Sequence, residues 1–319
     1  MKLLSPTIIE KKILENYMEY QNLFVQFQSK FLTELHTKYQ GLENGNIFLY
    51  YAKQTHQDIL RQKDYDLNFN LSYKNFWSNH HRANPRKKSI VNIAEDTFVP
   101  KETARRKILE LIKQQVLGKK NKKISWLPNE QYKQSYNLYV NQEIKDVSRL
   151  ISFVSEKINF SISSEVIIEE IEEKFSFYWF HYLNVQLNYL KLWTKQFNDR
   201  ELILIFLQLA SMFVSKAKEK NLSYKDLYDK PSLIQNFISS SISVTSISEV
   251  TNIPRATCAR KLSRLVALKV IEQDKNTKRY YIIPNSIADN LISKKITGEI
   301  IKLFSEFYFI CIRAINAKV

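Results

Sequence analysis

The chain has 319 residues, and its 48 Lys and Arg against 32 Asp and Glu give a formal net charge of +16. Hydrophobic residues make up 44% of it, enough for the cores of two domains of ordinary size. Only four glycines are present, which leaves no Gly-rich phosphate loop and argues against a nucleotide-binding fold. Cys258 and Cys311 lie far apart in apolar periodic segments, so neither a disulfide framework nor a metal-ligand spacing is expected.

The first predicted element is a long amphipathic helix. Apolar and aromatic residues recur every three or four positions from Ile9 to Phe31, and the same spacing returns from Ile167 to Tyr189. Such a stripe could line a ligand pocket, but helix packing is its commoner role, so we expect core. Further apolar helices are predicted from Ile47 to about Ile59 and from Glu201 to Lys216.

The start of the chain has no uninterrupted apolar stretch, so no signal peptide is expected there. The most apolar run, Leu202 to Val214, is too short to span a bilayer. We therefore expect a cytoplasmic protein and no membrane partner.

One stretch occurs twice. Ser89 to Lys107 returns as Ser243 to Lys261 at an offset of 154 residues, with eight of 19 positions identical. A repeat of about half the chain length indicates a duplicated unit. The sequence therefore predicts two units, residues 1–160 and 161–319, whose repeated motifs occupy about 86–128 and 240–284.

The repeated stretch is typical of a short helix, a turn and a second helix. Pro100 suits the first position of that second helix. Its residues at helical spacing form one apolar stripe: Ala104, Ile108, Leu111 and Ile112. Four mostly basic residues lie on the other side: Lys101, Glu102, Arg105 and Arg106. A helix with an apolar back and a basic outer face, preceded by a short helix, is what DNA reading by a helix-turn-helix requires.

Positive charge is concentrated around the two copies. Residues 86–123 contain 12 basic and 4 acidic residues, and residues 243–279 contain 8 basic and 3 acidic residues. Two matched clusters of this kind predict a polyanionic partner.

A two-stranded ribbon is predicted directly after each second helix. In the first copy Val116 and Leu117 begin one strand, a lysine-rich turn follows, and residues 124–129 return. In the second copy Val270 and Ile271 lead through a charged turn to residues 280–285. Each ribbon ends in Pro-Asn, after which a long helix is expected, over Glu130 to Lys157 and Ile287 to Ile315. Lysine-rich ribbon tips of this kind are placed to contact phosphates.

The segment "VTNIPRATCARKLSRLVALKVIEQD" resembles the winged helix-turn-helix of transcription regulators. The order helix, helix, winged motif, long helix is similar to one protomer of the MarR-type regulators, which pair through their terminal helices. The resemblance implies a mainly α fold with small β wings. Two tandem units in one chain would be joined by long helices in a pseudo-twofold arrangement, a fused dimer. The resemblance implies no particular small-molecule effector for this chain.

We therefore expect a sequence-specific, double-stranded-DNA-binding transcription regulator. It would read an imperfect palindrome with two recognition helices from one chain, as a monomer associated with the nucleoid. A plasmid-type replication initiator with two winged-helix domains is the main alternative, and a helical protein–protein adaptor is another. An enzyme is less expected, because the carboxylates are scattered and no His joins a Cys/His/Asp arrangement. No catalytic residue, metal or cofactor is expected.

The expected DNA-contacting residues lie on the second helix and the ribbon tip of each copy. In the first copy they are Lys101, Glu102, Thr103, Arg105, Arg106, Lys119, Lys120, Lys122 and Lys123. In the second copy they are Arg255, Ala256, Thr257, Arg260, Lys275, Lys278 and Arg279.

Overall fold

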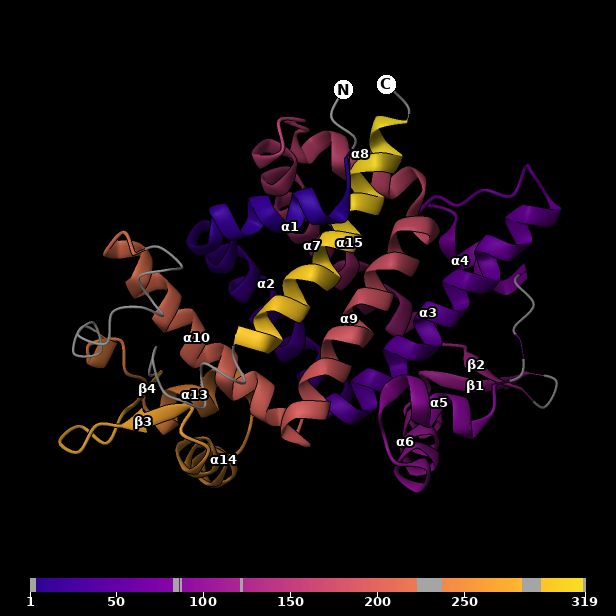
Figure 1. Ribbon diagram of the computed structural model, residues 1–319. Helices are drawn as coiled ribbons and strands as arrows, with labels where there is room; N and C mark the ends of the chain where they lie inside the picture. Colours follow the sequence, from indigo (N-terminus) through magenta and orange to yellow (C-terminus); the bar gives the residue numbers. More distant parts are fainter. Residues whose placement is uncertain are drawn as a thin grey trace.

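The fold is mainly helical, with two small two-stranded antiparallel sheets (Figure 1). It is seen in a computed structural model that describes residues 4–82, 86, 88–120, 123–222, 237–282 and 294–317. Within these ranges, none of the helices is long and apolar enough to cross a membrane.

The elements of the first half recur in the second, and four of the matched helix pairs have the same number of residues. The first-half elements are α1 (Pro6–Glu15), α2 (Tyr17–Tyr39), α3 (Leu42–Tyr65), α4 (Phe76–Arg82), α5 (Ile90–Thr97), α6 (Lys101–Lys113), β1 (Leu117–Lys120), β2 (Lys123–Trp126) and α7 (Glu130–Lys157). The second-half elements are α8 (Ser164–Glu173), α9 (Phe175–Phe197), α10 (Glu201–Glu219), α13 (Val244–Thr251), α14 (Arg255–Ala267), β3 (Ile271–Gln273), β4 (Tyr280–Ile282) and α15 (Lys294–Asn316). The matching lengths are 10 residues for α1 and α8, 23 for α2 and α9, 8 for α5 and α13, and 13 for α6 and α14.

The prediction of one continuous helix from Ile9 to Phe31 was wrong. The chain leaves helical geometry at Asn16 (φ −116°, ψ 33°), whose side-chain amide caps α1 by donating to the Lys12 carbonyl at 2.9 Å. An equivalent break separates α8 from α9 at Lys174. The apolar spacing continues across both breaks, because α1 turns to pack on α15 and α8 turns to pack on α7.

The helix expected from Ile47 to Ile59 is longer than predicted, because Gly45 lies inside α3. A Cβ on Gly45 would meet Leu35 Cγ at 2.5 Å, so glycine allows α2 and α3 to approach closely here. The turn before α3 uses Gly41 with φ 135°. The first glycine therefore makes the turn, and the second makes the helix contact.

The long helices of the two halves bury their apolar stripes against each other. The largest interhelical contacts outside neighbouring elements join α3 to α9 and α2 to α10. The ring centroids of Phe24 and Phe304 lie 4.8 Å apart, and those of Phe27 and Tyr182 lie 6.2 Å apart. The hydroxyl oxygens of Tyr20 and Tyr308 are 3.1 Å apart. The expectation that the aromatic stripe is core is confirmed, and this core is shared between the halves.

The two repeated helix pairs, α5 with α6 and α13 with α14, begin in the same way. Ser89 and Ser243 cap α5 and α13 by accepting from the backbone N–H three residues on. Pro100 and Pro254 stand one position earlier than predicted, as the residues before α6 and α14. The buried stripe is Ala104, Ile108 and Leu111 in α6, and Cys258, Leu262 and Leu265 in α14.

An antiparallel ribbon follows each of these segments. Leu117 pairs with Trp126 across β1 and β2, and Ile271 pairs with Ile282 across β3 and β4. The α7 helix begins and ends where the sequence predicted, and the Asn129 side chain caps it by accepting from the Tyr132 N–H at 2.8 Å. The predicted start of the last helix at residue 287 and the preceding Pro-Asn lie outside the described residues, and α15 is described from residue 294.

Candidate nucleic-acid interface

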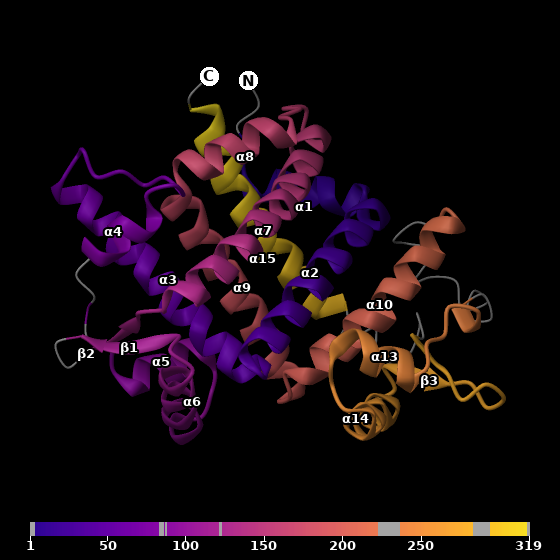
Figure 2. The ribbon, with the colours of Figure 1, turned by 180° about the vertical axis from the view of Figure 1, so that it is seen from behind.

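The two helices expected to read DNA lie along one edge of the molecule. Figures 1 and 2 show α6 and α14 at the same edge from opposite sides, with the corner between α9 and α10 between them. An extended ligand that touches both helices must therefore pass over this corner.

The predicted contact residues of α6 are largely exposed. Lys101, Glu102, Arg105 and Arg106 are exposed, and Thr103 is half-buried. Arg105 Nε lies 3.9 Å from Glu102, and Arg106 Nε lies 3.9 Å from Glu110. Exposed pairs of this length contribute little to stability, so an anionic ligand could replace the carboxylates at small cost.

The α14 helix presents a less charged face. Arg255, Ala256 and Arg260 are exposed, and Thr257 is half-buried. Ala256 occupies the repeat position of Glu102, and Ala259 that of Arg105. Arg260 forms no ion pair with any described residue, unlike its counterpart Arg106. The two helices therefore offer different chemistry at equivalent positions.

The ribbon tips are only partly described. Lys119 is exposed and Lys123 is half-buried, whereas Lys122 and the side chain of Lys120 lie outside the described residues. In the other ribbon, Lys275, Lys278 and Arg279 are all exposed. Asp274 shapes that turn by accepting from both the N–H and the hydroxyl of Thr277, each at 2.6 Å.

The corner between α9 and α10 holds α14 through a buried ion-pair cluster. Lys261 Nζ donates to both carboxylate oxygens of Asp199, at 2.7 and 2.6 Å, and lies 3.1 Å from Glu201. Arg264 adds a hydrogen bond of 2.7 Å to the Phe197 carbonyl. The Lys261 side chain is only 7% exposed. The neighbouring His36 and Lys261 lower the pKa of Glu201 to about 2.

The same corner holds the turn between α5 and α6 in the other half. Arg200 Nη2 donates to the Phe98 carbonyl at 2.6 Å and to the Thr97 carbonyl at 3.1 Å, and Nη1 lies 3.8 Å from Glu43. A cation at the carboxyl end of a helix is favourable, because unpaired carbonyls gather there. Phe98 has φ 56°, an uncommon conformation for a bulky residue, and Arg200 fixes its carbonyl there.

Lys107 is the repeat counterpart of Lys261, yet its pairing differs. Its Nζ lies 2.9 Å from Glu110 on the same helix. Two neutral side chains tie α6 to the α2–α3 corner: Asn44 donates to Glu110 at 3.2 Å, and Gln114 donates to Gln40 at 3.4 Å. The second copy carries Arg264 at the position of Glu110, so both of its cations turn to the corner instead.

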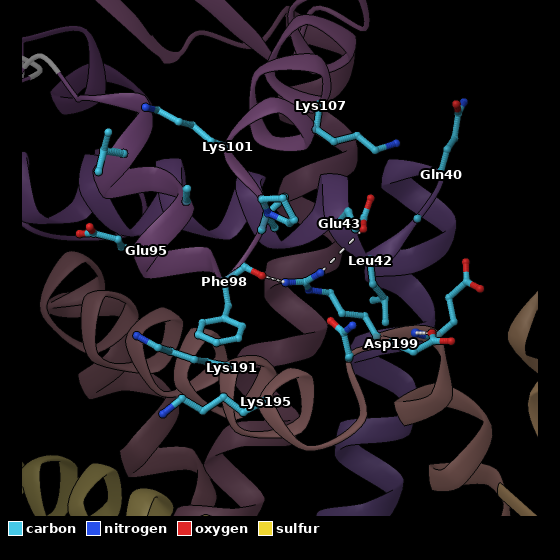
Figure 3. A pocket seen from close by; sticks show the side chains of 18 of the residues that line it. Gln40, Leu42, Glu43, Glu95, Phe98, Lys101, Lys107, Lys191, Lys195 and Asp199 are labelled. Atoms are coloured by element: carbon cyan, nitrogen blue, oxygen red, sulfur yellow. Dashed lines mark hydrogen bonds and ion pairs between the residues drawn. The ribbon is translucent and has the colours of Figure 1, made fainter. Parts of the chain in front are cut away.

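An open cleft of about 1050 Å³ lies where the α5–α6 segment meets the α2–α3 corner and the end of α9 with the α9–α10 corner, and α14 reaches it through Lys261. Figure 3 shows Lys101 and Glu95 on one side of it together with Lys191 and Lys195 from α9, and the Phe98 ring beside them. Its lining also includes Lys107, Arg200 and Lys261, which reach it from both halves.

Five residues of this region were not expected from the sequence. Lys191 and Lys195 stand one turn apart on a helix that has no other Lys, Arg, Asp or Glu, a signal that could have marked them. Asp199 lies just before α10, and its side chain accepts a hydrogen bond from the Glu201 N–H at 3.1 Å. The longer-range pairings of Asp199, Arg200 and Glu201 have no local signature.

Searches for related proteins find no match. The chain matches no protein-family model, no curated protein and no solved structure at a significant level. The described residues contain no group of three His, Cys, Asp or Glu side chains that could hold a metal ion.

Proposed function

We propose that the chain is a sequence-specific, double-stranded-DNA-binding transcription regulator built from two tandem winged helix-turn-helix units. The observation that carries the proposal is the paired helix-turn-helix and ribbon. Both copies have the same caps and buried stripe, and both place basic residues at one edge of the molecule. In this interpretation α6 and α14 are the recognition helices, and the two ribbons are wings that contact phosphates.

The reading faces differ, so the two half-sites should differ too. Glu102 can accept from a cytosine amino group and Arg105 can bind guanine with two hydrogen bonds. Ala256 and Ala259 offer only apolar contact, for example to a thymine methyl group. We expect an imperfect palindrome with half-site centres about 34 Å apart, one helical turn of DNA. The half-site read by α14 should be the richer in A·T pairs.

One chain should suffice for binding. A protomer with a single recognition helix needs a partner to place a second one. Here the second half supplies it, and the shared aromatic core between α2, α9 and α15 joins the halves.

Selection from random duplexes, with light scattering of the complex, tests the proposal. Two unequal half-sites bound by one chain are expected. A perfect palindrome would refute the asymmetric reading, and a single half-site would mean that one unit does not read DNA. No enrichment over a variant with Arg105, Arg106 and Arg260 replaced by Ala would refute DNA reading altogether. Footprints on iterated sites in the native replicon would favour a replication initiator instead.

A further inference from the structure

The cleft between the α5–α6 segment and the α9–α10 corner contains more positive charge than its own carboxylates neutralise. Six cationic side chains line it: Lys101, Lys107, Lys191, Lys195, Arg200 and Lys261. Lys107, Arg200 and Lys261 are tied to carboxylates as described above. The other three form no ion pair with any residue that the structure describes, and only Glu95 remains unpaired among the lining carboxylates. An excess of two positive charges therefore faces the cleft.

These three lysines come from both halves of the molecule. Lys101 begins α6 in the first half, whereas Lys191 and Lys195 lie one turn apart on α9 in the second. In Figure 3 Lys191 and Lys195 lie beside the Phe98 ring, and Lys101 lies farther along the same side of the cleft, beyond Glu95. Phe98 is 42% exposed there, as is Val91. The side chains therefore form a basic rim around a partly apolar surface.

The walls that carry these lysines are fixed relative to each other. Arg200 joins the α9–α10 corner to the α5–α6 turn through two carbonyls, and it is only 8% exposed. Asp199 and Glu201 join the same corner to α14. The helices that carry the rim are therefore held in place before any ligand arrives, so only the lysine side chains need ordering on binding.

Geometry limits what can occupy this rim if both recognition helices bind DNA. A duplex in contact with α6 and α14 must cross the corner that lies between them. The segment that crosses it is the spacer between the half-sites, and its phosphates are the nearest polyanion. We propose that Lys191 and Lys195, together with Lys101, bind the phosphate backbone of this spacer. This inference rests on the proposed function and adds a central contact to it.

The pair Lys191→Gln and Lys195→Gln tests this contact. Each phosphate contact contributes roughly 0.9 to the slope of log K against log salt, so the double variant should lose about 1.8. The loss should appear on the full site and vanish on a duplex trimmed to one half-site. Neutral methylphosphonate linkages in the spacer should reduce wild-type binding and have no further effect on the double variant.

A matched control removes the same charge elsewhere. Lys11→Gln with Lys145→Gln changes exposed lysines on α1 and α7, which do not line the cleft, and should leave the slope nearly unchanged. Circular dichroism and a urea titration would verify that both double variants fold. An unchanged slope for the cleft variant, or an equal loss on a single half-site, overturns the central contact while DNA reading stands. If the wild type binds no duplex, both proposals fail.

Discussion

Removing the charge of Lys261 should destabilise the protein much more than the same change at its repeat counterpart. Lys261 is 7% exposed, with Asp199 at 2.6 Å and Glu201 at 3.1 Å. Lys107 is 17% exposed and pairs along its own helix with Glu110, which is 39% exposed. The same residue type at the same motif position thus lies in two different electrostatic settings.

The expected magnitudes follow from these settings. Breaking a buried ion pair leaves the other charge uncompensated and costs about 3–5 kcal/mol. Because Glu201 is 35% exposed, we expect the lower end, about 3 kcal/mol, for Lys261→Gln. An exposed pair spaced three or four residues along one helix contributes about 0.3–0.5 kcal/mol, so Lys107→Gln should cost about that much.

Urea unfolding followed by circular dichroism at neutral pH measures both changes. Lys261→Gln should lower the midpoint several times more than Lys107→Gln, with a similar dependence on urea. Combining Lys261→Met with Asp199→Asn and Glu201→Gln should recover part of the loss, because no buried charge is then left unpaired. Equal losses of unfolding free energy in the two single variants would refute the view that a buried ion-pair cluster anchors α14.

Three further predictions address DNA binding and pH. Arg260→Ala should weaken specific DNA binding by about 1–3 kcal/mol. Arg106→Ala should weaken it by less, because Glu110 already competes for the Arg106 side chain. Equilibrium binding titrations should show that order, and loss of folding in either variant would indicate a structural role. Replacing the lysines of the first ribbon together should flatten the salt slope by up to about 3, and an unchanged slope would show that this ribbon points away from DNA. These lysines are Lys119, Lys120, Lys122 and Lys123. Burial raises the pKa of Glu143 to about 8, so the folded chain holds an extra proton between that value and the ordinary carboxyl range near 4.5. Stability should therefore fall as pH rises through this window, by up to about 1.4 kcal/mol per unit, and Glu143→Gln should remove that slope in urea titrations from pH 5 to 8.

Local signals predicted most of the secondary structure around the candidate site. The buried stripe of α6 and the two strands of each ribbon follow from periodicity. Ser89, Ser243 and Asn129 were not predicted to be caps, although their side chains accept from backbone N–H groups three residues away, which is also a local signal. Such features depend on neighbours in the chain, so sequence reasoning can predict them.

Features that depend on distant contacts were missed or wrong. The apolar spacing gives no sign of the helix breaks at Asn16 and Lys174. The directions of α1 and α8 are set instead by packing against a helix of the other half. Arg200 and Phe98 are 102 positions apart in the chain, and no spacing rule joins them. The contacts that anchor α6 and α14 therefore became visible only in the structure.

The two copies are anchored at different places, and this should affect their dynamics. In the first copy the turn is fixed, because Arg200 and Asn46 both donate to the Thr97 carbonyl. In the second copy the turn has an exposed hydrogen bond of 3.0 Å from Asn252 to Thr37, while Lys261 and Arg264 anchor the helix itself.

Hydrogen exchange by mass spectrometry can measure this difference. Amides in residues 107–113 should exchange faster than those in residues 261–267, because the described residues of α6 form ion pairs only within their own helix, and the end of α6 is held by the hydrogen bonds from Asn44 and to Gln40 and by apolar contacts. Lys261→Gln should bring the second segment toward the first, and Lys107→Gln should change neither. Equal protection of the two segments in the wild type would contradict this account. Faster exchange in residues 107–113 would mean that the end of α6 is held less firmly than the end of α14. Under the proposed function, α6 would then be the helix that adjusts, around its anchored turn, to the spacing of the second half-site.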